Sequence, residues 1–273
     1  MSSERELSNK KVLSEIFKST LGERFVPIQE INFKDEYYLD HFVHNLGEIE
    51  TKNPKLKKLF LYDRDLRFIY IDIALIVLRI NKDGCQLNRK EELWEIILER
   101  EWTRSESEEY ESLRYLIDYL DLDVRSLFIH ILIFMDKLAR FLSLVIDAKN
   151  LTRKSFDKFK KALKNLRGKE IEEFTCLINE NTGWFKTVKD LRDDFIEHHP
   201  GASGIIGFSN GKSHVVLTTT EKMDMESKTV YMEFKTVYIK EIDDVLAQLK
   251  KFLQSLNDFL CNRIEVLPMK DED

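Results

Sequence analysis

Arg192, Asp193, His198 and His199 form the most compact group in the chain that could carry out a reaction. An arginine provides a fixed positive charge and a planar fork of donors that suits phosphate oxygens. A histidine can give or take a proton near neutral pH. RNA cleavage needs both functions: one group moves a proton at the ribose 2′-hydroxyl or the leaving oxygen, and another offsets charge on the phosphate. The group therefore matches the needs of RNA cleavage.

These residues lie at the end of a predicted amphipathic helix. Apolar residues recur at steps of three and four over residues 183–199, and Thr182 is the candidate cap at its start. Pro200 disfavours the helical conformation for His199, and glycines punctuate the segment that follows. We therefore expect the helix to end at the histidines.

Two histidines compete for the role beside Arg192. At about 100° per residue, Arg192 and His199 are about 20° apart around an ideal helix, and Arg192 and His198 are about 120° apart. A purely structural alternative pairs Arg192 with Glu197 and places protonated histidines at the negative end of the helix dipole. Spacing alone leaves both histidines, and this alternative, open.

Metal chemistry is a weaker interpretation of the same segment. Asp194 and His198 are one turn apart, with Glu197 or His199 near enough to add a ligand. Metal-independent catalysis fits the single arginine better. His41 and His44 are also one turn apart, but no third ligand is near them in the sequence. We therefore expect no metal and no cofactor.

The pattern in residues 192–199 resembles the signature of the HEPN superfamily. Its catalytic members are metal-independent ribonucleases with an Arg-x4–6-His motif on the last helix of a bundle. Arg192 and His198 give x5, Arg192 and His199 give x6, and Asp193 stands where that family usually has a polar residue. The resemblance covers roughly residues 90–262.

The resemblance implies a composite active site between two protomers that pack their motif helices together. His198 would act as general acid or base, with His199 as its substitute. Arg192 would stabilise charge at the scissile phosphate, and Asp193 would orient one of the two. By analogy the setting would be toxin–antitoxin or anti-phage defence, with an antitoxin protein as a further partner.

A basic segment precedes the motif. Residues 149–169 carry nine lysines and arginines against Asp157 alone, while an inward stripe of phenylalanine and leucine indicates a helix. Such a helix is either a solvated face or a surface that follows the phosphates of a nucleic acid. The predicted RNA contacts are Arg153, Lys154, Lys158, Lys160, Lys161, Lys164 and Arg167.

Composition indicates a folded and mainly helical protein. Of the 273 residues 43% are hydrophobic, and only 9 glycines and 4 prolines interrupt them. The net charge of −6 excludes a protein that coats nucleic acid by bulk electrostatics.

The N-terminus lacks the apolar region of a signal peptide, and the most apolar run, residues 68–80, is too short to span a bilayer. We therefore expect a cytoplasmic protein that does not enter a membrane. Cys85, Cys176 and Cys261 are expected to be reduced core thiols.

The expected architecture is a HEPN-like helical bundle with a small β insertion. We assign residues 1–85 to an N-terminal region of unknown role packed on the bundle, 86–265 to the bundle and 266–273 to a flexible tail. Strands at 205–209 and 213–220 form a predicted hairpin around Asn210-Gly211, and 228–239 adds a third antiparallel strand. A closing helix covers residues 240–264.

Other elements are predicted from apolar spacing and turn residues. Helices are expected at 37–50, 89–101 and 170–180, with a loop at 52–58 and a turn at 81–84. Residues 68–80 suit either a strand or a buried helix. A long central helix should begin at a cap, Asp121 or Asp123, and continue to Val145, with His130 as a satisfied core residue.

An alternative function belongs to a different class. The chain would then be a non-catalytic helical module that binds RNA, a nucleotide or a protein partner, and its basic segment would matter more than its histidines. A further interpretation makes the 205–239 sheet an interaction surface.

Overall fold

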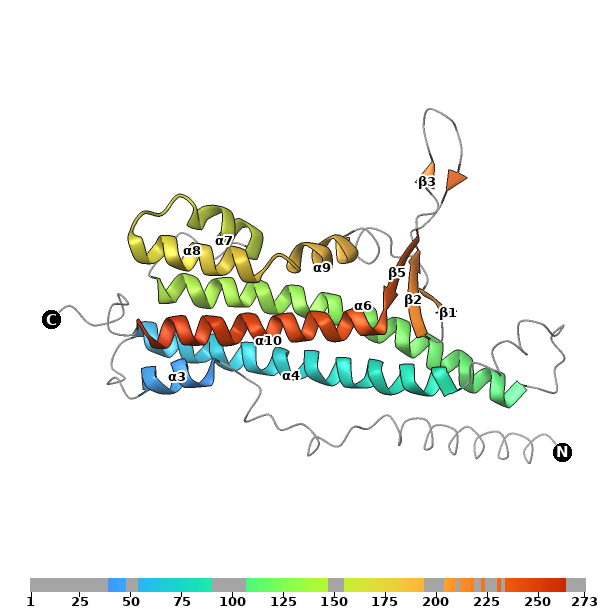
Figure 1. The fold of residues 1–273 in the computed structure, drawn as a ribbon. Helices are drawn as coiled ribbons and strands as arrows, with labels where there is room; N and C mark the ends of the chain where they lie inside the picture. Colours follow the sequence, from blue (N-terminus) through green and yellow to red (C-terminus); the bar gives the residue numbers. More distant parts are fainter. Residues whose placement is uncertain are drawn as a thin grey trace.

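The computed structural model describes residues 39–47, 54–89, 107–146, 155–193, 204–209, 212–218, 222–223, 230–231 and 234–263. Within these residues the fold is mainly helical and is built on long helices (Figure 1): α4 (Pro54–Arg89), α6 (Ser107–Val145) and α10 (Ile239–Cys261). The most extensive contact joins α4 to α6. None of the described helices combines the length and the apolar character that crossing a membrane requires.

Shorter helices pack on this frame. They are α3 (Asp40–Gly47), α7 (Phe156–Leu163), α8 (Lys169–Asn181) and α9 (Phe185–Arg192). Both α7 and α9 contact α6, α8 contacts α7 and α10, and α3 contacts α10 and α4. The helices predicted at 37–50, 170–180 and 240–264 are thus confirmed as α3, α8 and α10, whereas the segment predicted at 89–101 lies largely outside the described residues.

A small antiparallel sheet precedes α10. The strands are β1 (Gly204–Ser209), β2 (Lys212–Thr218) and β5 (Phe234–Tyr238), in the order β1-β2-β5, and β3 (Lys222–Met223) pairs separately with β4 (Val230–Tyr231). Ser209 lies opposite Lys212 in the register. The Glu241 carboxylate accepts the backbone N–H of Tyr238 at 3.0 Å. This bond secures the start of α10 directly after β5 (Figure 1).

One core connects the helices. Its largest fully buried side chains come from α3, α6, α7, α8 and α10, and they include Phe42, Phe128, Phe134, Phe141, Phe156, Phe159, Phe174 and Phe252. Phe42 of α3 meets Phe141 of α6 edge-on, with ring centroids 6.2 Å apart. Helix α4 runs continuously across positions 85 and 86, where the sequence suggested a boundary, and contributes Leu66 and Ile73 to the same core.

Two expectations around α4 need correction, the loop at 52–58 and the turn at 81–84, and the choice left open for 68–80 is decided. The predicted loop at 52–58 is largely helical, because proline is accepted at the first position of a helix, where Pro54 stands. Residues 68–80 form a helix and not a strand. The predicted turn at 81–84 is also helical. Two of its polar residues face the rest of the fold: Asn81 donates to Asp243 of α10 at 2.7 Å, and Asp83 is fully buried.

The start of the central helix was also mispredicted. Helix α6 begins at Ser107, more than three turns before the expected caps. Asp121 accepts from Arg125 one turn later, at 2.8 and 3.0 Å, and Asp123 pairs with Arg79 of α4. Their carboxylates bind cations from the middle of the helix and do not cap its first backbone amides.

Asp136 of α6 supplies the cap that α7 lacks locally. Ser155 makes no side-chain bond at the start of α7, whereas the Asp136 carboxylate accepts the backbone N–H of Phe156 at 2.9 Å. We expect Asp136→Ala to lower the free energy of unfolding by about 1 kcal/mol, measured by urea unfolding. Asp136→Asn keeps an acceptor oxygen and should lose less than half of that. Equal losses in both variants would contradict the capping role.

The cysteines do not share one environment. Cys85 and Cys176 are exposed and Cys261 is half-buried, so the expectation of core thiols is wrong for the first two. A hydrogen bond to Glu180 raises the pKa of the exposed Cys176 thiol. Burial raises the pKa of Cys261. In both, the thiol form is favoured over the more nucleophilic thiolate.

Candidate functional site

Helix α9 positions the arginine of the predicted motif. Its inner face buries Phe185, Val188 and Leu191, the spacing expected of an amphipathic helix. Because Leu191 faces inward, Arg192 follows at the edge of the buried face, with about a quarter of its side chain exposed. The helical conformation extends to Asp193 (φ −63°, ψ −48°).

The predicted cap of α9 is wrong. Trp184 precedes the first residue of α9 and is itself in the helical region. The Thr182 hydroxyl turns back to α8 and donates to the carbonyl of Ile178 at 2.6 Å, while it accepts from Lys160 of α7 at 2.8 Å. Thr182 therefore connects α8 to α7 and does not start α9.

Arg192 and Asp193 lie together. Their Nε and Oδ1 atoms form an ion pair at 2.9 Å, and the Asp193 side chain is 28% exposed. A carboxylate at this place can hold the guanidinium in one orientation while the group stays within reach of solvent. His198 and His199, and with them Asp194 of the alternative metal interpretation, lie outside the described residues.

The predicted basic segment contains a short helix. Phe156, Phe159 and Leu163 of α7 are buried, which confirms the inward stripe. Lys158 and Lys161 on α7, and Lys164 and Arg167 in the connection that follows, are exposed. We call these four side chains the basic surface. Arg153 and Lys154 lie outside the described residues.

Contacts between α7 and α9 join the start of the basic segment to the helix that carries Arg192. Lys189 of α9 donates to Asp157 of α7 at 2.7 Å, and this hydrogen bond raises the pKa of Lys189. The rings of Phe156 and Phe185 meet edge-on below it, with centroids 5.3 Å apart. Lys189 lies one turn before Arg192. Residue spacing does not reveal this pair, although Asp157 is the lone acidic residue of the segment 149–169.

Lys160 differs from the other predicted RNA contacts. It is partly buried, and its ammonium donates to Thr182. Burial lowers its pKa, and the neighbouring charge of Lys164 contributes. The side chain therefore joins α7 to the end of α8, whereas the basic surface faces solvent.

This lowered pKa predicts a pH effect on stability. Because the folded protein binds the Lys160 proton less tightly than the unfolded chain, stability rises with pH from the folded pKa of Lys160 up to its unfolded value near 10.5. We expect Lys160→Met to remove this rise in the free energy of unfolding. The rise should be below about 1 kcal/mol, because the side chain is only partly buried and solvent screens its charge. Urea unfolding at pH 7 and pH 10 measures it. An unchanged rise in the variant would assign it to another group.

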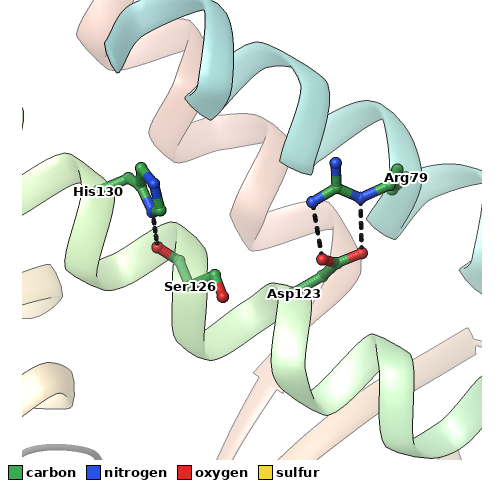
Figure 2. Close-up of polar contacts among 4 residues, drawn as sticks. All are labelled: Arg79, Asp123, Ser126 and His130. Atoms are coloured by element: carbon green, nitrogen blue, oxygen red, sulfur yellow. Dashed lines mark hydrogen bonds and ion pairs between the residues drawn. The ribbon is translucent and has the colours of Figure 1, made fainter.

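A second polar group joins α4 to α6 (Figure 2). Arg79 donates two hydrogen bonds to the Asp123 carboxylate, at 2.8 and 3.0 Å, and this interaction raises the pKa of Arg79. His130 lies on the same face of α6 but two turns further, about 10 Å along the axis. Its Nδ1 lies 2.7 Å from the carbonyl of Ser126, which can only accept, so Nδ1 carries the proton. The distance excludes a proton relay between Asp123 and His130, and the Arg79–Asp123 pair serves to hold the two long helices together.

Metal binding finds no support in the part of the chain that the structure describes. There, no group of three or more histidine, cysteine, aspartate or glutamate side chains is arranged to hold an ion. His44 is exposed on α3.

The candidate site therefore consists of a paired arginine at the end of α9 and of exposed cations on α7, a helix that contacts α9 through Asp157 and Phe156. Phosphate groups are ligands that such cations bind. Comparison of the chain with family models, with curated proteins and with solved structures finds no match to any of them. The likeness to the HEPN superfamily thus remains a prediction from residues 192–199 and their helical setting.

Proposed function

We propose that this protein is a metal-independent endoribonuclease of the HEPN type. RNA would lie on the basic surface and be cut beside Arg192. The observation that supports the proposal is the contact of Lys189 with Asp157, because it joins α7, with its exposed Lys158 and Lys161, to the helix that carries the arginine of the motif. Each cation that meets a phosphate releases counterions, which favours RNA binding even though the whole chain is acidic.

Cleavage would follow the ordinary chemistry of the ribose 2′-hydroxyl. One histidine takes the proton as the 2′-oxygen attacks the phosphorus, and a second histidine protonates the departing 5′-oxygen. Arg192 offsets the charge that develops on the phosphate, and Asp193 holds its guanidinium in place. The products would be a 2′,3′-cyclic phosphate and a 5′-hydroxyl. His198 is the first choice for the histidine, and His199 is its substitute.

We further propose that the active unit is a homodimer. By the HEPN likeness, the ends of two α9 helices would meet, so each chain would contribute one histidine and one arginine. The general acid and the general base could then be the same histidine, contributed once by each protomer. A toxin–antitoxin or defence role, with an antitoxin that restrains the enzyme, follows from this likeness.

Incubation of the purified protein with a mixed RNA pool in EDTA tests the activity. We expect cleavage that leaves cyclic phosphate ends and that falls by about 10²–10⁴-fold in His198→Ala, while RNA binding is retained. His199→Ala serves as the matched control one residue away and should cleave nearly as well as the native chain. If the loss occurs in His199→Ala instead, the two histidines exchange roles.

Charge reversal tests the path of the RNA. Lys158→Glu combined with Lys161→Glu should weaken RNA binding and reduce its dependence on salt. Lys57→Glu combined with Lys58→Glu is the matched control, because these adjacent lysines are also exposed but lie on α4. Binding without cleavage by a folded dimer would favour the non-catalytic RNA-binding module, and equal losses in both pairs would remove the basic surface from the site.

A further inference from the structure

A cavity of about 250 Å³ lies between α9 and α10. Its described floor is apolar and deeply buried: Phe128 comes from α6, Val188 and Leu191 from α9, and Val237 from β5. Val245 of α10 and Trp184 line it as half-buried residues. The indole N–H of Trp184 is occupied, since it donates to the carbonyl of Asn181 at 2.9 Å, so the ring offers the cavity its apolar surface.

The rim of the cavity carries negative charge. Glu241, Asp244 and Gln248 lie along one face of α10, and Thr187 of α9 is a further exposed lining residue. One Glu241 oxygen accepts the N–H of Tyr238, and the Asp244 side chain is exposed. The described lining residues include two carboxylates and no lysine or arginine.

We propose that this cavity binds a small organic ammonium ion with an aromatic or branched hydrocarbon body. The hydrocarbon would fill the buried floor, and the ammonium would meet Asp244 and Glu241 at the rim through charge-assisted hydrogen bonds. The volume is below the roughly 300–1,000 Å³ of sites for drug-sized ligands, so the ligand is small. An RNA phosphate is disfavoured, because the same carboxylates repel it. The site is thus distinct from the basic surface, and it does not depend on the proposed ribonuclease activity.

Three probes of nearly equal shape test this assignment on the full chain. They are 2-phenylethylammonium, the neutral 2-phenylethanol and the anion 3-phenylpropanoate. Titrations are followed through the NMR signals of the methyl groups of Val188, Leu191 and Val245, which line the cavity. We expect the ammonium ion to bind with a Kd on the order of 1 mM, as suits so small a ligand. The alcohol should bind more weakly, and the anion at least about tenfold more weakly.

Two variants separate the body of the ligand from its charge. Asp244→Asn changes an exposed side chain, so it should fold normally and weaken ammonium binding by about two- to fivefold, with little effect on the alcohol. Val245→Phe should fill the cavity and abolish binding of all three probes. The proposal is overturned if the anion binds as tightly as the ammonium ion, if Asp244→Asn changes nothing, or if no probe shifts the three methyl signals at 10 mM.

Discussion

Arg192→Ala is expected to reduce the rate of RNA cleavage by about 10²–10³-fold, the usual effect of removing one preorganised group that stabilises transition-state charge. The side chain is about a quarter exposed, and its Nε pairs with the adjacent Asp193. Because the rest of the side chain is buried, the free energy of unfolding should also fall, by about 0.5–3 kcal/mol. Single-turnover cleavage in EDTA, beside urea unfolding of the same preparation, measures both quantities.

Two companion variants make the Arg192 result specific. Arg192→Lys keeps the charge but loses the planar fork of donors, so it should recover only part of the rate. Lys186→Ala removes an exposed cation from the same helix and should leave the rate within about twofold. If Lys186→Ala is as inactive as Arg192→Ala, the arginine acts through the summed positive charge of α9 and does not contact the scissile phosphate.

Phe156→Ala is expected to lower the free energy of unfolding by about 3–5 kcal/mol. The ring is fully buried where three helices meet: its centroid lies 5.3 Å from that of Phe185 in α9 and 6.4 Å from that of Phe252 in α10. Truncation would leave a cavity between the basic surface and α9. RNA affinity should consequently fall as well, although Phe156 has no contact with solvent.

Phe156→Leu provides the control for this position. Leucine keeps most of the apolar volume, so the loss of stability should stay below about 1.5 kcal/mol and RNA affinity should be close to that of the native chain. Urea unfolding and RNA titration at low temperature, where both variants remain folded, give the comparison. A loss below about 1 kcal/mol in Phe156→Ala would show that α7 is not anchored through this ring.

Apolar spacing located the helices far better than it located their ends. The stripes of α6, α7, α8, α9 and α10 are readable because a buried helix face repeats every three to four residues whatever it packs against. Proline, asparagine and aspartate are weaker signals. Pro54 begins a helix, the segment with Asn81 continues one, and Asp121 and Asp123 bind arginines in the middle of another. Each of these side chains suits both a helix end and a tertiary contact, and packing decides between them.

The candidate site divides in the same way. The sequence alone identified Arg192 and the basic segment, because charge and residue type are visible without a fold. It could not distinguish Lys160 from its exposed neighbours, since the difference comes from Thr182, 22 residues away. Nor could it predict the cavity between α9 and α10, whose walls come from four separate elements.

For this protein, the sequence by itself determined a mainly helical chain, the inner faces of its helices and the residues able to meet phosphate. Those properties are local, because they depend on which side chains recur at helical spacing and on which ones carry charge. Only the tertiary structure decided that Asp136 caps α7, that Arg79 pairs with Asp123 and that Lys189 joins α7 to the helix of Arg192. These contacts join residues 20, 44 and 32 positions apart, so they exist only once the hydrophobic faces have packed and set the helices side by side.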